Sequence, residues 1–161
     1  MPDSQPDRDE TPSERADRLW NEMLQEVRVC QTGAQILFGF LLSVVFTPRF
    51  TTLPDFDRRL YVATVVLGAV ATATLIAPVA FHRFLIGHGV KPELVRVAGR
   101  FITTGLALLA LTITTALLLL LRTALDATGW AWFLTGAVLL WFALCWLLLP
   151  QVVLRRAERR G

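Results

Sequence analysis

Four long stretches without a charged residue constrain this chain more than any other feature. Three of them contain between 20 and 22 residues, and the fourth contains 28. As an α-helix, a stretch of about 20 residues rises by about 30 Å, which matches the hydrocarbon core of a bilayer. Backbone polar groups inside a bilayer need internal partners, and a helix supplies them. We therefore predict an all-α fold, a four-transmembrane-helix bundle within residues 29–154. Its spans are expected at about residues 29–47, 60–81, 101–121 and 130–150.

The composition agrees with a membrane protein and argues against a nucleic-acid-binding one. Apolar residues make up 54% of the 161-residue chain, and its mean hydropathy is +0.52. The net charge is +3, but the basic residues lie at the ends of the apolar stretches, where lipid headgroups lie. We therefore expect a lipid bilayer with anionic headgroups as the main partner, and no nucleic acid.

The segments outside the spans differ in character. Residues 1–10 are polar and rich in Pro and Asp, which predicts a disordered cytoplasmic tail. Residues 11–28 predict an amphipathic helix that continues into the first span. Thr11 is its expected N-cap, and Glu14 is the capping-box partner. In the loop at residues 48–59, Asp55 and Arg59 have the spacing of a helical ion pair. Residues 155–161 form a basic cytoplasmic tail.

The distribution of Lys and Arg predicts the orientation. The N-terminal segment, the loop at residues 82–100 and the C-terminal tail carry 12 of the 16 basic residues. The other ends of the spans carry four. By the positive-inside rule, both termini and the 82–100 loop are cytoplasmic.

A line of polar residues enters the first span. Its members recur at steps of four and three, so they share one face of a helix. Two interpretations are open: a cytoplasmic vestibule or proton path with Glu22 or Glu26 as carrier, or an interfacial helix whose amides bond to neighbouring helices. We call this line the polar stripe: Asn21, Gln25, Arg28, Thr32 and Gln35. Glu22, Glu26 and Gln31 flank it.

A second polar group lies at the end of the second span. Pro78 removes a backbone donor and frees the carbonyl of Thr74, which permits a kink. His82 and Arg83 follow within one turn, on the same side of the membrane as Glu22 and Glu26. Either they pair with those carboxylates, with His82 titrating near neutral pH, or they extend to the headgroups.

The remaining candidates indicate packing rather than chemistry. The Thr residues of the third span can bond to their own helix, and Gly105 among them favours close helix contact. Cys30 and Cys145 are apolar in context and form no CxxC pair. No nucleophile elbow, phosphate loop or HExxH motif is present. We therefore expect no catalytic residue, no metal and no cofactor.

Three segments together carry a resemblance: W-N-E-M-L-Q-E-V-R-V-C-Q-T-G-A-Q-I-L-F-G-F-L-L at residues 20–42, F-D-R-R-L-Y at 56–61 and I-A-P-V-A-F-H-R at 76–83. The chain resembles a family of small actinobacterial membrane proteins of unknown function. The resemblance implies a four-helix protein of the bacterial inner (plasma) membrane, and it supplies no catalytic residue. We expect a non-enzymatic structural, accessory or regulatory envelope protein, partnered by its own copy or another membrane protein. The alternative is a small oligomeric proton or cation transporter that uses the polar stripe.

Overall fold

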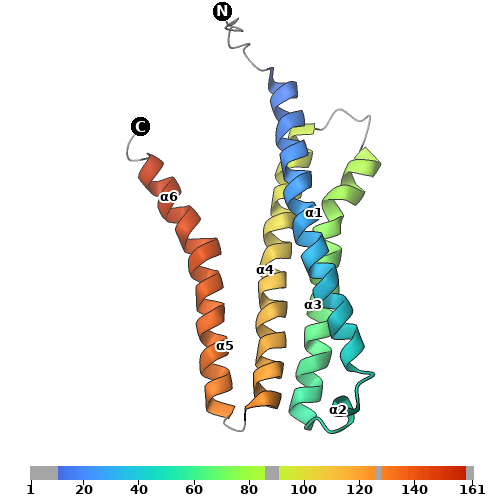
Figure 1. Ribbon diagram of the computed structural model, residues 1–161. Coiled ribbons are helices and arrows are strands. Elements are labelled where there is room, and N and C mark those ends of the chain that lie inside the picture. The colour runs from blue at the N-terminus through green and yellow to red at the C-terminus, as the bar shows by residue number, and fades with distance from the viewer. Residues whose placement is uncertain (1–10, 86–90, 126–127, 159–161) are drawn as a thin grey trace, which may run out of the picture.

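The computed structural model describes residues 11–85, 91–125 and 128–158, and it confirms the all-α fold (Figure 1). Four of its helical stretches are long and apolar enough to cross a membrane. The predicted tail at residues 1–10 lies outside the described residues. The helices are α1 (Pro12–Val44), α2 (Pro48–Thr51), α3 (Asp55–Leu85), α4 (Lys91–Ala124), α5 (Thr128–Ala143), the π-helix η1 (Leu144–Leu148) and α6 (Leu149–Glu158).

Helix α1 begins where the sequence predicts and runs without a break into the first apolar stretch. The backbone N–H of Thr11 donates to Glu14 Oε2 at 2.9 Å, and Glu14 N–H donates to Thr11 Oγ1 at 3.3 Å. This capping box satisfies donors that a helix start leaves without partners. The 33 residues of α1 extend over about 50 Å, longer than a bilayer core.

The long helices share two common ends (Figure 1). The start of α1, the end of α3, the start of α4 and the end of α6 lie at one end, which we call the terminal end. The opposite end, which we call the loop end, contains α2, the last turn of α4 and the first turn of α5. Helix α2 is one turn inside the predicted loop at residues 48–59, so part of that loop is helical.

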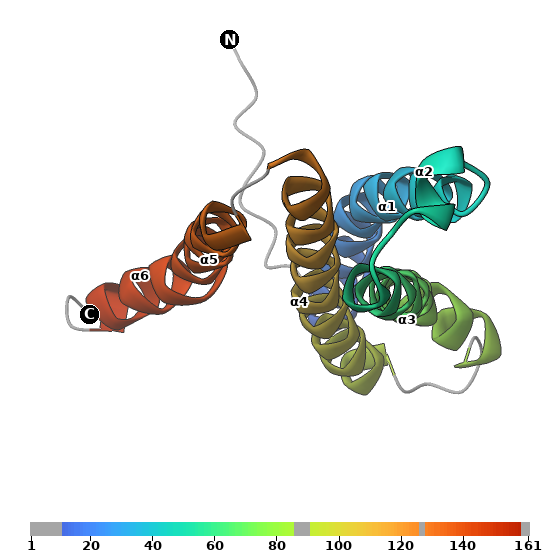
Figure 2. The same ribbon diagram turned by 90° about the horizontal axis from the view of Figure 1, so that it is seen from below.

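The core of the protein is the group α1, α3 and α4, in which α3 and α4 form the most extensive pair (Figure 2). Helix α3 turns one face to its neighbours along its whole length, at steps of four and three residues. Every residue of that face is buried: Asp57, Tyr61, Thr64, Gly68, Ala71, Leu75 and Pro78.

Two glycines allow the three core helices to approach closely. A Cβ atom at Gly105 of α4 would lie 2.7 Å from Leu75 Cδ2, and the Leu75 side chain is fully buried in α3. A Cβ atom at Gly68 of α3 would lie 3.1 Å from Phe38 Cδ2 of α1 and 3.4 Å from Thr112 Cγ2 of α4. Small residues at such contacts are what membrane helices use for tight association. The expected packing role of Gly105 is confirmed.

Four of the five Thr hydroxyls in the third predicted span are satisfied within α4, as the sequence predicts, whereas the exposed Thr104 makes no hydrogen bond with a described residue. Thr112 Oγ1 donates to the Leu108 carbonyl at 2.8 Å, and Thr114 Oγ1 donates to the Ala110 carbonyl at 2.7 Å. Thr103 and Thr115 bond in the same manner to carbonyls four residues earlier. These hydroxyls therefore need no partner from outside α4.

The fourth apolar stretch lies at the edge of the bundle. Only 6% of its apolar window is buried, against 33% for α4. It packs mainly against α4 near the loop end and diverges from α4 toward the terminal end (Figure 1). The sequence placed the end of this span at Pro150, but the helix continues to Glu158.

The helix passes Pro150 because a π-helical turn precedes it. Proline lacks an N–H and clashes with the carbonyl four residues earlier, here that of Trp146. In η1, which contains Trp146, the Leu149 N–H donates to the Leu144 carbonyl, a step of five residues. This wider turn accommodates the proline ring without ending the helix.

The contact at Gly105 yields a test of the fold. We expect Gly105→Ala to lower the free energy of unfolding by about 1–3 kcal/mol, because the new methyl group meets a fully buried leucine. Gly99→Ala, in the same helix, meets no atom within 4 Å. It should be neutral or stabilising by up to about 1 kcal/mol through helix propensity. Denaturant titration of the purified protein in detergent micelles measures both, and equal effects would contradict this account.

Candidate functional site

The polar stripe lies on the surface of α1 rather than between helices. All five of its residues are exposed, and so are Glu22 and Glu26. The opposite face of α1 provides the core contacts, through Val27, Ala34 and Leu41 at intervals of seven residues. Glu22 pairs with Arg18 on the same helix, with an N–O distance of 3.2 Å. The stripe therefore does not line a passage inside this bundle.

Gln31 behaves differently from the stripe because it faces the core. Its side-chain Nε2 donates to the backbone carbonyl of Leu75 at 2.8 Å. That carbonyl lies in the turn before Pro78, which is fully buried, next to the Thr74 carbonyl that the proline frees. One amide thus links α1 to α3 at the predicted polar spot, and the same Leu75 packs on Gly105.

The remaining predicted site residues are only partly placed. Arg83 is exposed near the end of α3. His82 belongs to α3, but its side chain lies outside the described residues, and so does any pairing with Glu22 or Glu26. Within the described part of the chain, no group of three His, Cys, Asp or Glu residues could hold a metal ion.

The stripe continues along α1 to the middle of the apolar stretch and beyond. Gly39 and Leu42 extend its alternation of four- and three-residue steps, and both are exposed. A Cβ atom added at Gly39 would meet nothing within 4 Å. Gln35 makes no hydrogen bond with any described residue. We call the polar stripe together with Gly39 and Leu42 the extended stripe. The other helices of this bundle leave this face uncovered.

The loop end contains an ion pair that the sequence did not lead us to expect. Arg122, in the last turn of α4, donates through Nε to Asp57 Oδ1 of α3 at 2.5 Å. The exposed fractions of the two side chains are 17% and 5%. The guanidinium carbon also lies 4.6 Å from the ring centroid of Phe56, a cation–π geometry. The pair is therefore charge-balanced and enclosed.

Neighbouring contacts fasten the same end of the bundle. Arg49 of α2 donates through Nη2 to the Thr123 carbonyl at 2.9 Å, in the last turn of α4, where carbonyls lack helical partners. Tyr61 OH donates to the Leu41 carbonyl of α1 at 2.9 Å. The Tyr61 ring meets the Phe50 ring edge to face, with centroids 5.0 Å apart. All three core helices are thus joined here.

The sequence contains a signal for the Asp57–Arg122 pair. A search for opposite charges that are close in sequence does not detect it. Asp55 and Arg59 were expected to pair, but both are exposed, and Asp57 forms the ion pair instead. Asp57 is the first residue of the buried face of α3, four residues before Tyr61. Extending that periodicity back from the apolar span places Asp57 inside and Asp55 outside.

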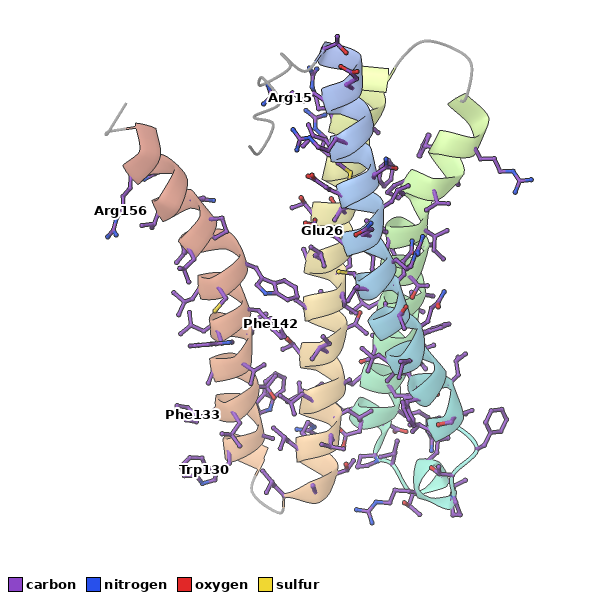
Figure 3. The ribbon with its side chains drawn as sticks, turned by 45° about the horizontal axis from the view of Figure 1, so that its top comes forward. Arg15, Glu26, Trp130, Phe133, Phe142 and Arg156 are labelled. Carbon is purple, nitrogen blue, oxygen red and sulfur yellow. The ribbon has the colours of Figure 1, made fainter. Side chains whose placement is uncertain are left out.

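An apolar groove lies between α4 and the continuous helix of α5, η1 and α6, which we call the fourth helix. Its volume is about 600 Å³. Phe142 points from the α5 side into this space, whereas Trp130 and Phe133 point outward (Figure 3). The residues that line the groove are Thr103, Leu106, Ala107, Ala110 and Leu111 of α4, with Leu139, Phe142, Ala143, Cys145, Trp146 and Pro150 across it.

These features define the class: an all-helical membrane protein with a packed three-helix core and a peripheral fourth helix. The chain belongs to a family of unknown function, DUF6328, which matches residues 9–150. The matched segment contains the polar stripe, the Asp57–Arg122 pair and the groove. No curated protein and no solved structure matches the chain.

The ion pair predicts a large and specific loss of stability. Asp57→Asn should lower the free energy of unfolding by about 3 kcal/mol, because it leaves the enclosed Arg122 charge uncompensated. Arg122→Gln should cost a similar amount, and the double variant should cost less than the sum of the two.

Asp55→Asn is the matched control, since Asp55 is exposed in the same turn of α3. Its loss should stay below about 1 kcal/mol, the scale of a helix-dipole contribution. Unfolding titrations in detergent give all four values. Additive single effects would show that the pair is not coupled.

Proposed function

We propose that this chain is a non-enzymatic, multi-pass protein of the bacterial inner membrane that acts as a structural or accessory component through association of membrane helices. The observation that carries the proposal is the uncovered polar stripe of α1. It supports a role in association because a polar face inside a bilayer needs a partner that lipid tails do not supply.

Gln35 is the central residue of this argument. It lies seven residues beyond Arg28, which places it about 10 Å along the apolar stretch. Its side chain is exposed and makes no hydrogen bond with any residue that the structure describes. An unpartnered amide in hydrocarbon costs about 2–7 kcal/mol depending on the reference state. A second helix that supplies a donor and an acceptor removes that cost.

The spacing along α1 supports a second copy of the same chain as the partner. Gln25, Arg28, Thr32, Gln35, Gly39 and Leu42 follow the alternating steps of a two-helix seam. An amide is both donor and acceptor, so Gln35 can pair with Gln35 of a second copy. The open space at Gly39 allows the two backbones to approach. The same arrangement would place the two Arg28 side chains at the headgroup level, where they can diverge toward lipid phosphates.

The orientation that we propose places both termini in the cytoplasm. It is supported by the twelve basic residues on the terminal side against four on the other, and by exposed Trp130 and Trp132 at the loop end. We expect a fluorescent protein fused after Gly161 to fluoresce, and an alkaline phosphatase fused there to be inactive. Active phosphatase would reverse the assignment.

The transporter alternative is less well supported. The carboxylates beside the stripe, Glu22 and Glu26, are exposed near the terminal end. Beyond Gln35 the stripe contains Gly39 and Leu42, which offer no proton-carrying group. A polar line that stops partway gives no continuous route across a bilayer. Proton flux into liposomes that contain the purified chain, lost in Glu26→Gln, would overturn the proposed function.

Cysteine cross-linking tests the association. In a variant with Cys30 and Cys145 replaced by Ala, Thr32→Cys on the stripe should form a disulfide-linked dimer under mild oxidation in the membrane. Gly33→Cys is the control at nearly the same depth, because Gly33 is exposed, an added Cβ atom there meets nothing within 4 Å, and no stripe residue lies three or four residues from it. We expect Gly33→Cys to stay monomeric. Equal cross-linking at both positions would indicate random collision.

Replacing Gln35 tests the role of its amide. Gln35→Leu should weaken dimerisation in detergent by about threefold to tenfold, the range for hydrogen bonds between membrane helices. Ile36→Leu, at the neighbouring exposed position, should leave it unchanged. Fluorescence energy transfer between labelled copies measures both constants. An unchanged constant in Gln35→Leu would remove the amide from the interface.

A further inference from the structure

The groove between α4 and the fourth helix has a basic mouth. Arg96, Arg100, Thr103 and Ala107 follow one another on α4 at steps of four, three and four residues, so they share one face. The last two line the groove, and the two arginines precede it at the terminal end. Both arginines are exposed. Neither forms an ion pair with a side chain that the structure describes, which leaves out the side chains of residues 91–95.

The interior of the groove is apolar in nearly all its lining. Small side chains on α4, Ala107 and Ala110, face the bulky Phe142 and Trp146 across it. Its volume of about 600 Å³ falls within the usual range of small-molecule sites, roughly 300–1,000 Å³. The lining of α4 from Thr103 to Leu111 extends over about 12 Å along the helix. This shape suits a linear hydrocarbon chain that lies parallel to α4.

From this combination we propose that the groove binds one anionic phospholipid, with an acyl chain between α4 and α5–η1–α6 and its phosphate on Arg96 and Arg100. A zwitterionic lipid would fill the groove equally well, but it carries no net charge to complement two exposed arginines. Basic pockets between membrane helices bind anionic headgroups by this complementarity. The site lies away from the polar stripe and is independent of the function proposed above.

Arg156 offers a matched control for the headgroup contact. It is exposed near the same end of the molecule, but its side chain points away from α4 (Figure 3). Its removal changes the net charge by the same amount as removal of Arg100. A specific site should respond to Arg100 and not to Arg156, whereas attraction of anionic lipid to a basic surface should respond to both alike.

Native mass spectrometry of the full chain released from detergent micelles tests the site. We use dioleoyl phosphatidylglycerol and dioleoyl phosphatidylcholine as the probes. One phosphatidylglycerol per chain should be retained in preference to phosphatidylcholine. Arg96→Gln and Arg100→Gln should each reduce its retention by about fivefold, the scale of one arginine near an anionic headgroup. Arg156→Gln should leave it unchanged.

The groove itself is tested by Ala107→Trp, which fills the space and keeps both arginines. We expect loss of the bound phosphatidylglycerol, with the helical content by circular dichroism unchanged. Cys145 lines the groove and gives a second readout that needs no change to its wall. In a Cys30→Ala background, phosphatidylglycerol should slow labelling of Cys145 by N-ethylmaleimide, and Arg100→Gln should remove that protection.

Three results would overturn the proposal. Equal retention of the two lipids would show that the headgroup is not recognised. An equal loss in Arg156→Gln and Arg100→Gln would show general attraction to a basic surface. Unchanged phosphatidylglycerol binding and Cys145 labelling in Ala107→Trp would show that no acyl chain occupies the groove.

Discussion

The close approach of α3 and α4 at Leu75 and Gly105 is the contact on which the rest of the structure depends. Lipid tails are as apolar as leucine, so burial alone does not drive membrane helices together. Close side-chain packing and hydrogen bonds between helices determine which membrane helices associate. Gly105 leaves a space that Leu75 fills completely, and the carbonyl of the same leucine accepts the Gln31 amide. One residue thus sets the spacing of α3 and α4 and holds α1 against them.

Two polar contacts between helices indicate which helices belong to the core. Tyr61 reaches the Leu41 carbonyl, and Asp57 meets Arg122, so each of these contacts joins two of the three core helices. The fourth helix offers no such contact among the described residues. Its position is therefore set mainly by apolar packing near the loop end, and it is free to diverge from α4 where that packing stops.

The sequence predicted the helices well because length and hydropathy determine them almost alone. Thr11 and Glu14 also marked the start of α1, since capping is a local interaction. The Asp57–Arg122 pair was missed because its partners are 65 residues apart and only the helical periodicity of α3 hints at burial. The π-turn before Pro150 was missed because proline ordinarily ends a helix, and tertiary geometry decides the exception. The groove could not be foreseen, as it depends on the angle between two helices.

The two uncovered surfaces lie on different sides of the molecule, which gives them separate roles. Figure 2 shows α1 and α5 on opposite sides of α4. The extended stripe belongs to α1 alone, whereas the groove is formed by α4 and the fourth helix. A dimer that pairs two copies of α1 would therefore leave both grooves at its outer edges, open to lipid. Because the core between them is held by Gln31 in the middle of α1 and by Arg122 at the loop end, occupation of one surface need not deform the other. Self-association and lipid binding should then contribute independently to the stability of this protein in the membrane.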